Sequence, residues 1–90
     1  MGEKMNPYEI IQYPLMTEKV MKEIENENKV SFVVSRRSTK KTIKCAVTEL
    51  YGIEIKKINT LISTKGNKVA IILLKEEKAA ESLATKLGML

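Results

Sequence analysis

The sequence contains no histidine and no aspartate, and all 11 of its acidic residues are glutamates. Structural zinc sites take most of their ligands from cysteine and histidine, and Cys45 is the one residue of either type. Catalytic arrangements of the Ser-His-Asp or Cys-His kind need a histidine base. Paired glutamates could still do acid–base chemistry, but a 90-residue chain leaves little room for a deep pocket. We therefore expect a protein that is not an enzyme and that holds no metal, cofactor or small-molecule substrate.

Long apolar runs and cysteine pairs are also missing. No run approaches the ~20 apolar residues that span a bilayer, and the opening "MGEKMNPYE" lacks the apolar core of a signal peptide. The single cysteine cannot form an internal disulfide and fits a reducing compartment. We expect a cytoplasmic protein with no membrane partner, in which Cys45 is a partly buried structural residue. We also expect a flexible leader over residues 1–9 and a single domain over residues 10–90.

Positive charge, in contrast, is abundant and unevenly placed. From Lys29 to Lys68 the chain has ten basic and two acidic residues, a balance of +8. The remainder has six basic and nine acidic residues, a balance of −3. Such a separation of charge within one small domain indicates a polyanionic partner on one side.

Hydrophobic periodicity predicts four strands and three helices. The apolar run "VAIILL" predicts a central strand that is covered on both faces. The fold class is therefore α+β: a single-domain α/β/α sandwich with a mostly antiparallel four-stranded sheet, in the order (β)αβαββα with the last strand central. The predicted strands span residues 10–14, 29–35, 53–64 with a bulge near Lys56-Lys57, and 69–74; the predicted helices span residues 17–28, 40–51 and 76–87.

The segment "SRRSTKKTIK" carries five cations where a strand gives way to a helix. Cations at a helix N-terminus cost up to about 1 kcal/mol each at low salt. A bound phosphate would reverse that sign, because the first N–H groups of a helix point toward an anion. A solvated charged face is the alternative explanation, since most charge runs are only that. The candidate RNA contacts in this segment are Arg36, Arg37, Ser38, Thr39, Lys40, Lys41 and Lys44.

A second group of polar residues lies on the predicted hairpin between residues 53 and 74. Lysines that guard an edge strand against aggregation would explain this group equally well, but it lies in the same positive block. The chain has four aromatic residues and no aromatic ladder, so we expect contacts with RNA shape, loops and phosphates. The candidates here are Lys56, Lys57, Asn59, Thr60, Lys65 and Lys68.

Several stretches together resemble the archaeal form of the universal L23 family of large-subunit ribosomal proteins. They are "YPLMTEKVM", "VSFVVSRRSTKKTIKCAVTELYGIEIKKINTLIST", "KGNKVAIILL" and "LATKLGML", which cover about residues 10–90. The resemblance implies binding to large-subunit rRNA beside the peptide exit tunnel, with other ribosomal proteins as neighbours. It also implies a docking site for nascent-chain factors such as the signal recognition particle. Within the Thr-Glu-Lys motif, Glu18 corresponds to the docking residue, and Lys19 joins the expected rRNA contacts.

Bacterial members of that family carry a long hairpin that extends into the tunnel. Here "STKGNK" is short, so we expect any tunnel contact to be slight. Two alternatives remain at this point: a free RNA-binding regulatory module, and a protein-interaction domain with an incidental basic face. The salt dependence of binding separates the last from the others, and co-sedimentation with large subunits separates the first two.

Overall fold

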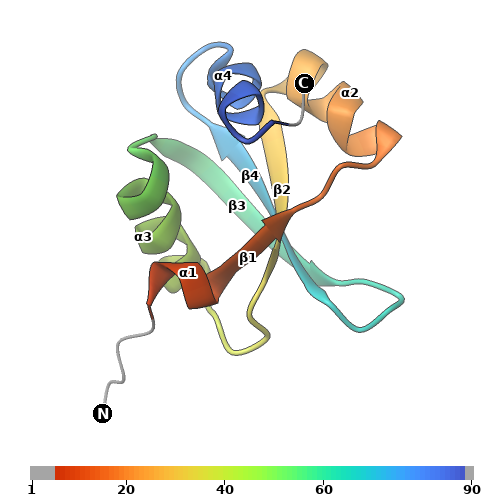
Figure 1. Ribbon diagram of the computed structural model, residues 1–90, viewed down its shortest axis with the longest axis vertical. Helices are drawn as coiled ribbons and strands as arrows, with labels where there is room; N and C mark the ends of the chain where they lie inside the picture. The colour runs from red at the N-terminus through yellow and green to blue at the C-terminus, as the bar shows by residue number, and fades with distance from the viewer. Residues whose placement is uncertain (1–5, 89–90) are drawn as a thin grey trace.

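The computed structural model describes residues 6–88, which form four helices and a four-stranded antiparallel sheet (Figure 1). The predicted α+β class is confirmed, as is the order of the seven predicted elements. No helix in the described part of the chain is long and apolar enough to cross a membrane. The elements are α1 (Pro7–Ile10), β1 (Ile11–Pro14), α2 (Glu18–Glu27), β2 (Lys29–Val34), α3 (Lys40–Tyr51), β3 (Ile55–Ile62), β4 (Lys68–Leu74) and α4 (Ala79–Lys86).

The strands lie in the order β1-β2-β4-β3, so the most apolar strand is central as predicted. β4 pairs antiparallel with both β2 and β3. The register of β3 shifts between Ile55 and Lys57, which confirms the expected bulge. Because side chains alternate between the two faces of a strand, this extra residue lets Ile55 and Ile58 both point into the core.

Local capping fixes the ends of the two longer helices. The Thr17 side chain accepts a hydrogen bond from the Val20 N–H at 3.2 Å and starts α2. α3 ends at Gly52, whose φ of 64° lies in the left-handed region that glycine adopts without a Cβ penalty. Thr17 therefore begins α2, and Gly52 ends α3.

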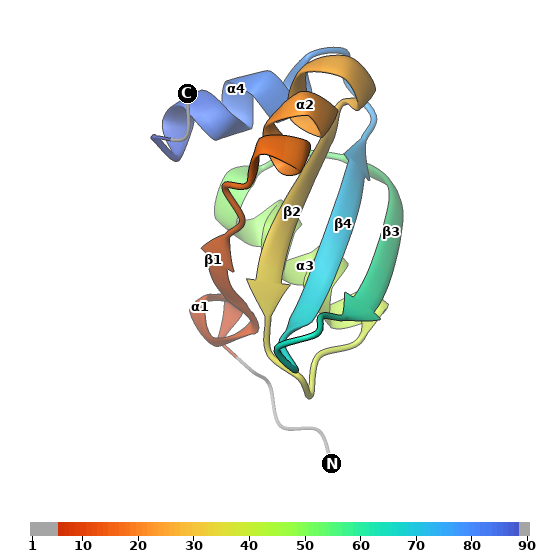
Figure 2. The ribbon, with the colours of Figure 1, turned by 90° about the vertical axis from the view of Figure 1, so that its right-hand side faces the viewer.

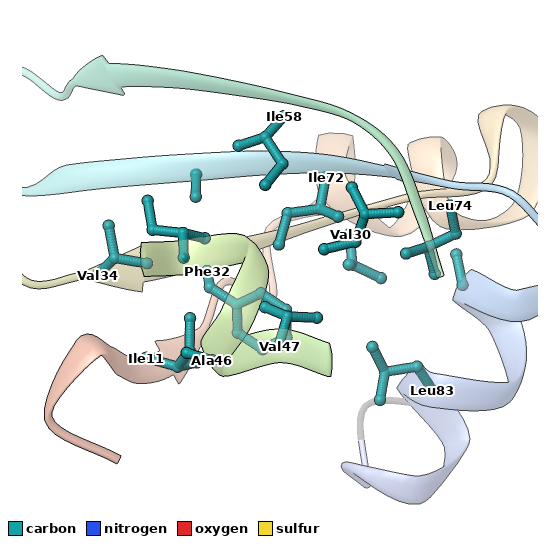
Figure 3. Packing of buried hydrophobic residues seen from close by; sticks show 14 of the residues in the cluster. Ile11, Val30, Phe32, Val34, Ala46, Val47, Ile58, Ile72, Leu74 and Leu83 are labelled. Atoms are coloured by element: carbon teal, nitrogen blue, oxygen red, sulfur yellow. The ribbon is translucent and has the colours of Figure 1, made fainter. Parts of the chain in front are cut away.

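The main core lies between α3 and one face of the sheet (Figure 3). Phe32 and Val47 are fully buried there, and the Phe32 ring stacks on Tyr51 with centroids 5.9 Å apart. α1 packs against α3 and buries Ile10. The predicted flexible leader is corrected here, because Pro7–Glu9 belong to α1; residues 1–5 lie outside the described residues.

The helices cover the two faces of the sheet unequally. α3 lies across one face, whereas α2 packs against β2 and α4 at one end of the sheet. On the face opposite α3, no helix of residues 6–88 crosses β3 and β4 (Figure 2). Ile71 and Leu73 are half-buried on this face, and Tyr13 and Leu61 are exposed there. The second helical layer of the predicted sandwich is thus limited to the end that carries α2.

Asn28 joins α2, β4 and α4 through its side chain. Its Oδ1 accepts a hydrogen bond from the Ala80 N–H at 2.8 Å, and its Nδ2 donates to the Leu74 and Glu76 carbonyls at 3.1 and 2.6 Å. Lys78 precedes α4 without a side-chain cap of its own. Asn28 therefore caps α4 from a distant part of the chain, and α4 begins at Ala79 rather than near the predicted residue 76.

Candidate nucleic-acid interface

The predicted basic segment forms an exposed turn that leads directly into α3. We call Ser35–Thr39 the basic turn, and we call this turn together with the start of α3 the basic junction. Arg36 and Arg37 lie in the turn and Lys40, Lys41 and Lys44 on α3, all with exposed side chains. The structure therefore brings these five predicted contacts together at one end of the sheet (Figure 1).

No acidic side chain in the described structure pairs with the basic junction. Within residues 6–88, the ion pairs join Lys29 to Glu27 at 3.0 Å and Lys75 to Glu54 at 3.6 Å. The first turn of α3 contains no acidic residue. Since Lys40 and Lys41 occupy that turn, their backbone N–H groups have no intrahelical carbonyl partner. Positive side chains and helix N–H groups therefore present charge of the same sign at this place.

The hydroxyl groups of the basic junction serve the protein itself. Ser38 is 2% exposed, and its Oγ donates to the Ser35 carbonyl at 2.5 Å. Thr39 and Thr42 form a reciprocal capping box, in which the Thr42 N–H donates to Thr39 Oγ1 and the Thr39 N–H to Thr42 Oγ1. Ser38 and Thr39 stay predicted RNA contacts, although the Ser38 hydroxyl already has a partner within the turn. In the sequence, the three-residue spacing of Thr39 and Thr42 at a helix start was the signal for the capping box.

The second predicted group does not form one patch. Lys57 pairs with Leu73, five residues along β4 from Lys68, and therefore lies about 17 Å from it along the strand. Lys56 lies beside Lys57 at the same distant end of the sheet. Asn59 and Thr60 point to opposite faces of β3, because they are neighbours in a strand.

Lys68 and Lys65 differ from each other as well. Lys68 is half-buried, and its Nζ donates a hydrogen bond to the Ser38 carbonyl at 2.5 Å. Lys65 is exposed in the turn between β3 and β4. This turn projects away from the basic turn, although both lie at the same end of the sheet (Figure 1). Of the second group, Lys68 is thus the residue that contacts the basic junction.

Glu18 and Lys19 are exposed in the first turn of α2. α2 and α4 lie together at the end of the sheet opposite the basic turn (Figure 2). Lys19 is therefore remote from the basic junction. Glu18, in the same turn, also lies on a different surface from the five cations.

Cys45 is exposed on α3, so the prediction of partial burial is wrong. α3 turns Ile43, Ala46 and Val47 toward the sheet. A residue at position 45 falls on the other side of the helix, one turn after Lys41. The nearness of Cys45 to apolar residues in sequence was misleading, because neighbours along a helix lie about 100° apart around its axis.

Comparison with known proteins identifies the family. Residues 9–79 match the family described as Ribosomal protein L23. Two similar relatives, each described as "Large ribosomal subunit protein uL23", are 46% identical in Methanosphaera stadtmanae and 45% identical in Methanococcus aeolicus. A third, from Methanothermobacter thermautotrophicus, has the same description and is 42% identical. Each alignment covers 94% of this chain and 99% of the relative. The chain therefore belongs to the ribosomal protein L23 family.

Proposed function

We propose that the protein is a structural constituent of the large ribosomal subunit in the cytoplasm and binds large-subunit rRNA through the basic junction. The observation that carries the proposal is the cluster of five exposed cations without acidic partners in the described structure. The relatives described as large-subunit proteins supply the setting. The bound rRNA lies beside the peptide exit tunnel, and neighbouring ribosomal proteins complete the environment.

Binding at the basic junction acts mainly through phosphates. Each arginine can place its planar guanidinium against two phosphate oxygens, whereas the lysines act as compact charges. The N–H groups at the start of α3 add donors toward the same anion. No aromatic side chain lies in the basic junction, so base stacking is not part of this contact. The contact therefore recognises RNA backbone geometry rather than base sequence.

The test compares the wild type with a variant that combines Arg36→Ala, Arg37→Ala and Lys41→Ala. The affinity of each is measured for protein-free large-subunit rRNA from Methanosphaera stadtmanae. Binding should weaken by orders of magnitude. The slope of log K against log salt should flatten by roughly 0.7–0.9 for each lost phosphate contact. An unchanged slope would show that these side chains do not contact RNA.

A matched control removes equal charge elsewhere, through Lys22→Ala, Lys75→Ala and Lys86→Ala. These three side chains are exposed and lie outside the positive block. We expect this control to retain most of the affinity and nearly all of the salt slope, because distant charges on the surface are screened. Equal losses in both variants would indicate only a general attraction of a basic protein to RNA.

The variant of the basic junction should also be as stable as the wild type, within about 1 kcal/mol, because cations at a helix start do not favour the helix. A clearly lower melting temperature would assign these residues a structural role. Co-sedimentation of the tagged wild-type protein with large subunits completes the test, because a free RNA-binding module would stay in the soluble fraction.

The surface around Glu18 is proposed as the docking site for exit-site factors such as the signal recognition particle. Glu18 is exposed in the first turn of α2, and α2 lies at the end of the sheet opposite the basic turn (Figure 2). Glu18 also suits the helix dipole at the start of α2, so the structural role must be separated from docking. The test compares Glu18→Lys with Glu25→Lys, an equal charge reversal at an exposed site of the same helix, in reconstituted large subunits.

Glu18→Lys should slow association of the signal recognition particle by a factor that shrinks as salt increases, while subunit assembly stays intact. Glu25→Lys should change the rate less. Equal rates for both variants, or failure of the Glu18→Lys subunit to assemble, would contradict the docking role.

A further inference from the structure

Lys68 holds the basic turn to the sheet. The other side-chain hydrogen bonds that shape this turn are local: Ser38 Oγ donates to the Ser35 carbonyl, the Arg37 N–H donates to Ser35 Oγ at 3.3 Å, and Thr39 and Thr42 form the capping box. Lys68, in contrast, lies 30 residues away and reaches the Ser38 carbonyl from β4. The hydrogen bond is charge-assisted and half-buried, which makes it stronger than a neutral surface contact.

The position of Lys68 within the sheet is itself fixed. Its backbone pairs with Val34 on β2 and with Ile62 on β3. The side chain therefore starts from a rigid part of the fold and ends at the last bend before α3. The hydrogen bond of Lys68 therefore sets the distance between the sheet and Ser38, the residue that follows the two arginines.

We propose that Lys68 is a positioning residue, which orders the basic turn so that Arg36 and Arg37 can bind phosphate, and is not itself a phosphate ligand. The inference rests on the proposed RNA contact of those arginines. An unfixed turn would have to be ordered on binding, and that ordering would lower the affinity. The Ser38 carbonyl takes one of the three N–H donors of Lys68, and the side chain is half-buried, so Lys68 is less free than the exposed arginines to follow an external anion.

The first experiment measures amide hydrogen exchange in the free protein, without RNA. In Lys68→Met the exchange rate of the Ser38 amide should increase by about tenfold, because local openings of a less constrained turn become more frequent. Lys68→Arg keeps a charged donor and should stay close to the wild type. Lys65→Met removes the same charge from the neighbouring turn and should leave the Ser38 amide unchanged. Equal exchange in the wild type and Lys68→Met overturns the proposal.

The second experiment is a double-mutant cycle with protein-free large-subunit rRNA from Methanosphaera stadtmanae. Lys68→Met should weaken binding about tenfold in the wild-type background, and less than about twofold once Arg36 and Arg37 are both alanine, since residues that act through one another are not additive. An equal loss in both backgrounds would make Lys68 an independent RNA contact and overturn the proposal. Lys65→Met should lower the rRNA affinity by the same factor in both backgrounds.

The two experiments separate this inference from the proposed function. If the wild type binds the rRNA without salt dependence, the proposed RNA contact fails, and the inference that Lys68 serves RNA binding fails with it. The exchange measurement still decides whether Lys68 holds the turn. If binding is normal but exchange is unaffected by Lys68→Met, the proposed function stands and the positioning role is wrong.

Discussion

Replacing Asn28 by alanine should lower the free energy of unfolding by about 3–5 kcal/mol. The variant loses the cap on the Ala80 N–H and the two hydrogen bonds to the Leu74 and Glu76 carbonyls. A lost cap costs about 1 kcal/mol, and the other two bonds cost about 0.5–1.5 kcal/mol each. Asn28 also has a φ of 57°, and a left-handed conformation costs alanine about 1 kcal/mol more. For a domain of this size, the melting temperature should fall by roughly 12–40 °C.

Two further variants separate the causes. Asn28→Gly adopts the left-handed backbone freely but loses all three side-chain hydrogen bonds, so it should retain most of the destabilisation. Asn26→Ala changes an exposed asparagine in the last turn of α2, two residues before Asn28, and should stay within about 0.5 kcal/mol of the wild type. The assay is urea unfolding followed by circular dichroism, with the slope m compared between variants. Wild-type stability in Asn28→Gly would show that only backbone strain matters, and would refute the assignment of Asn28 as the cap of α4.

Three other changes test separate parts of the fold. Burial raises the pKa of Tyr51 above its ordinary value of 10.0, and Tyr8 raises it further. Above pH 10 the Tyr51 hydroxyl therefore loses its proton more readily in the unfolded chain than in the folded one, so the wild type should lose stability as pH rises while Tyr51→Phe does not. Urea unfolding on both sides of pH 10 measures this difference. Cys45 should react with a thiol reagent in the native protein, and a bulky label there should reduce rRNA binding; protection until unfolding would contradict its exposed position. Gly52→Ala should cost about 1 kcal/mol from strain alone, since nothing lies within 4 Å of the added Cβ, and a much larger loss would mean that the chain ending α3 packs more tightly.

Patterns that arise within one element were predictable from the sequence. The alternation of Ile55 and Ile58 revealed the bulge in β3, and the run in β4 revealed the central strand. The same run did not reveal how far each face is covered. Ile71 and Leu73 are half-buried without a helix above them, because neighbouring strands already shield part of a central strand. An apolar sequence therefore indicates a central position more reliably than a second layer of helices.

Contacts between distant segments were not predictable. The basic junction was found because its five cations are close in sequence, and the structure keeps them together. The charge of Lys68 was visible in the sequence, but its hydrogen bond to the Ser38 carbonyl was not. Asn28 had no assigned role, because its three partners lie on β4 and near α4. A side chain that bonds a distant backbone group leaves no periodic pattern.

The long separations of these contacts have a consequence for synthesis of the chain on a ribosome. The Ser38 carbonyl bonds to Lys68, which is synthesised 30 residues later, and Asn28 bonds to Ala80, which is synthesised 52 residues later. Until β4 emerges, β2 has only the short β1 beside it, and a two-stranded pair is marginally stable in water. Folding of the first half thus depends on translation of the second. A product that stops after β3 would carry every cation of the basic junction and yet lack Lys68, which bonds the basic turn. If Lys68 positions that turn as proposed, an incomplete chain would compete poorly with a complete one for incorporation into a subunit.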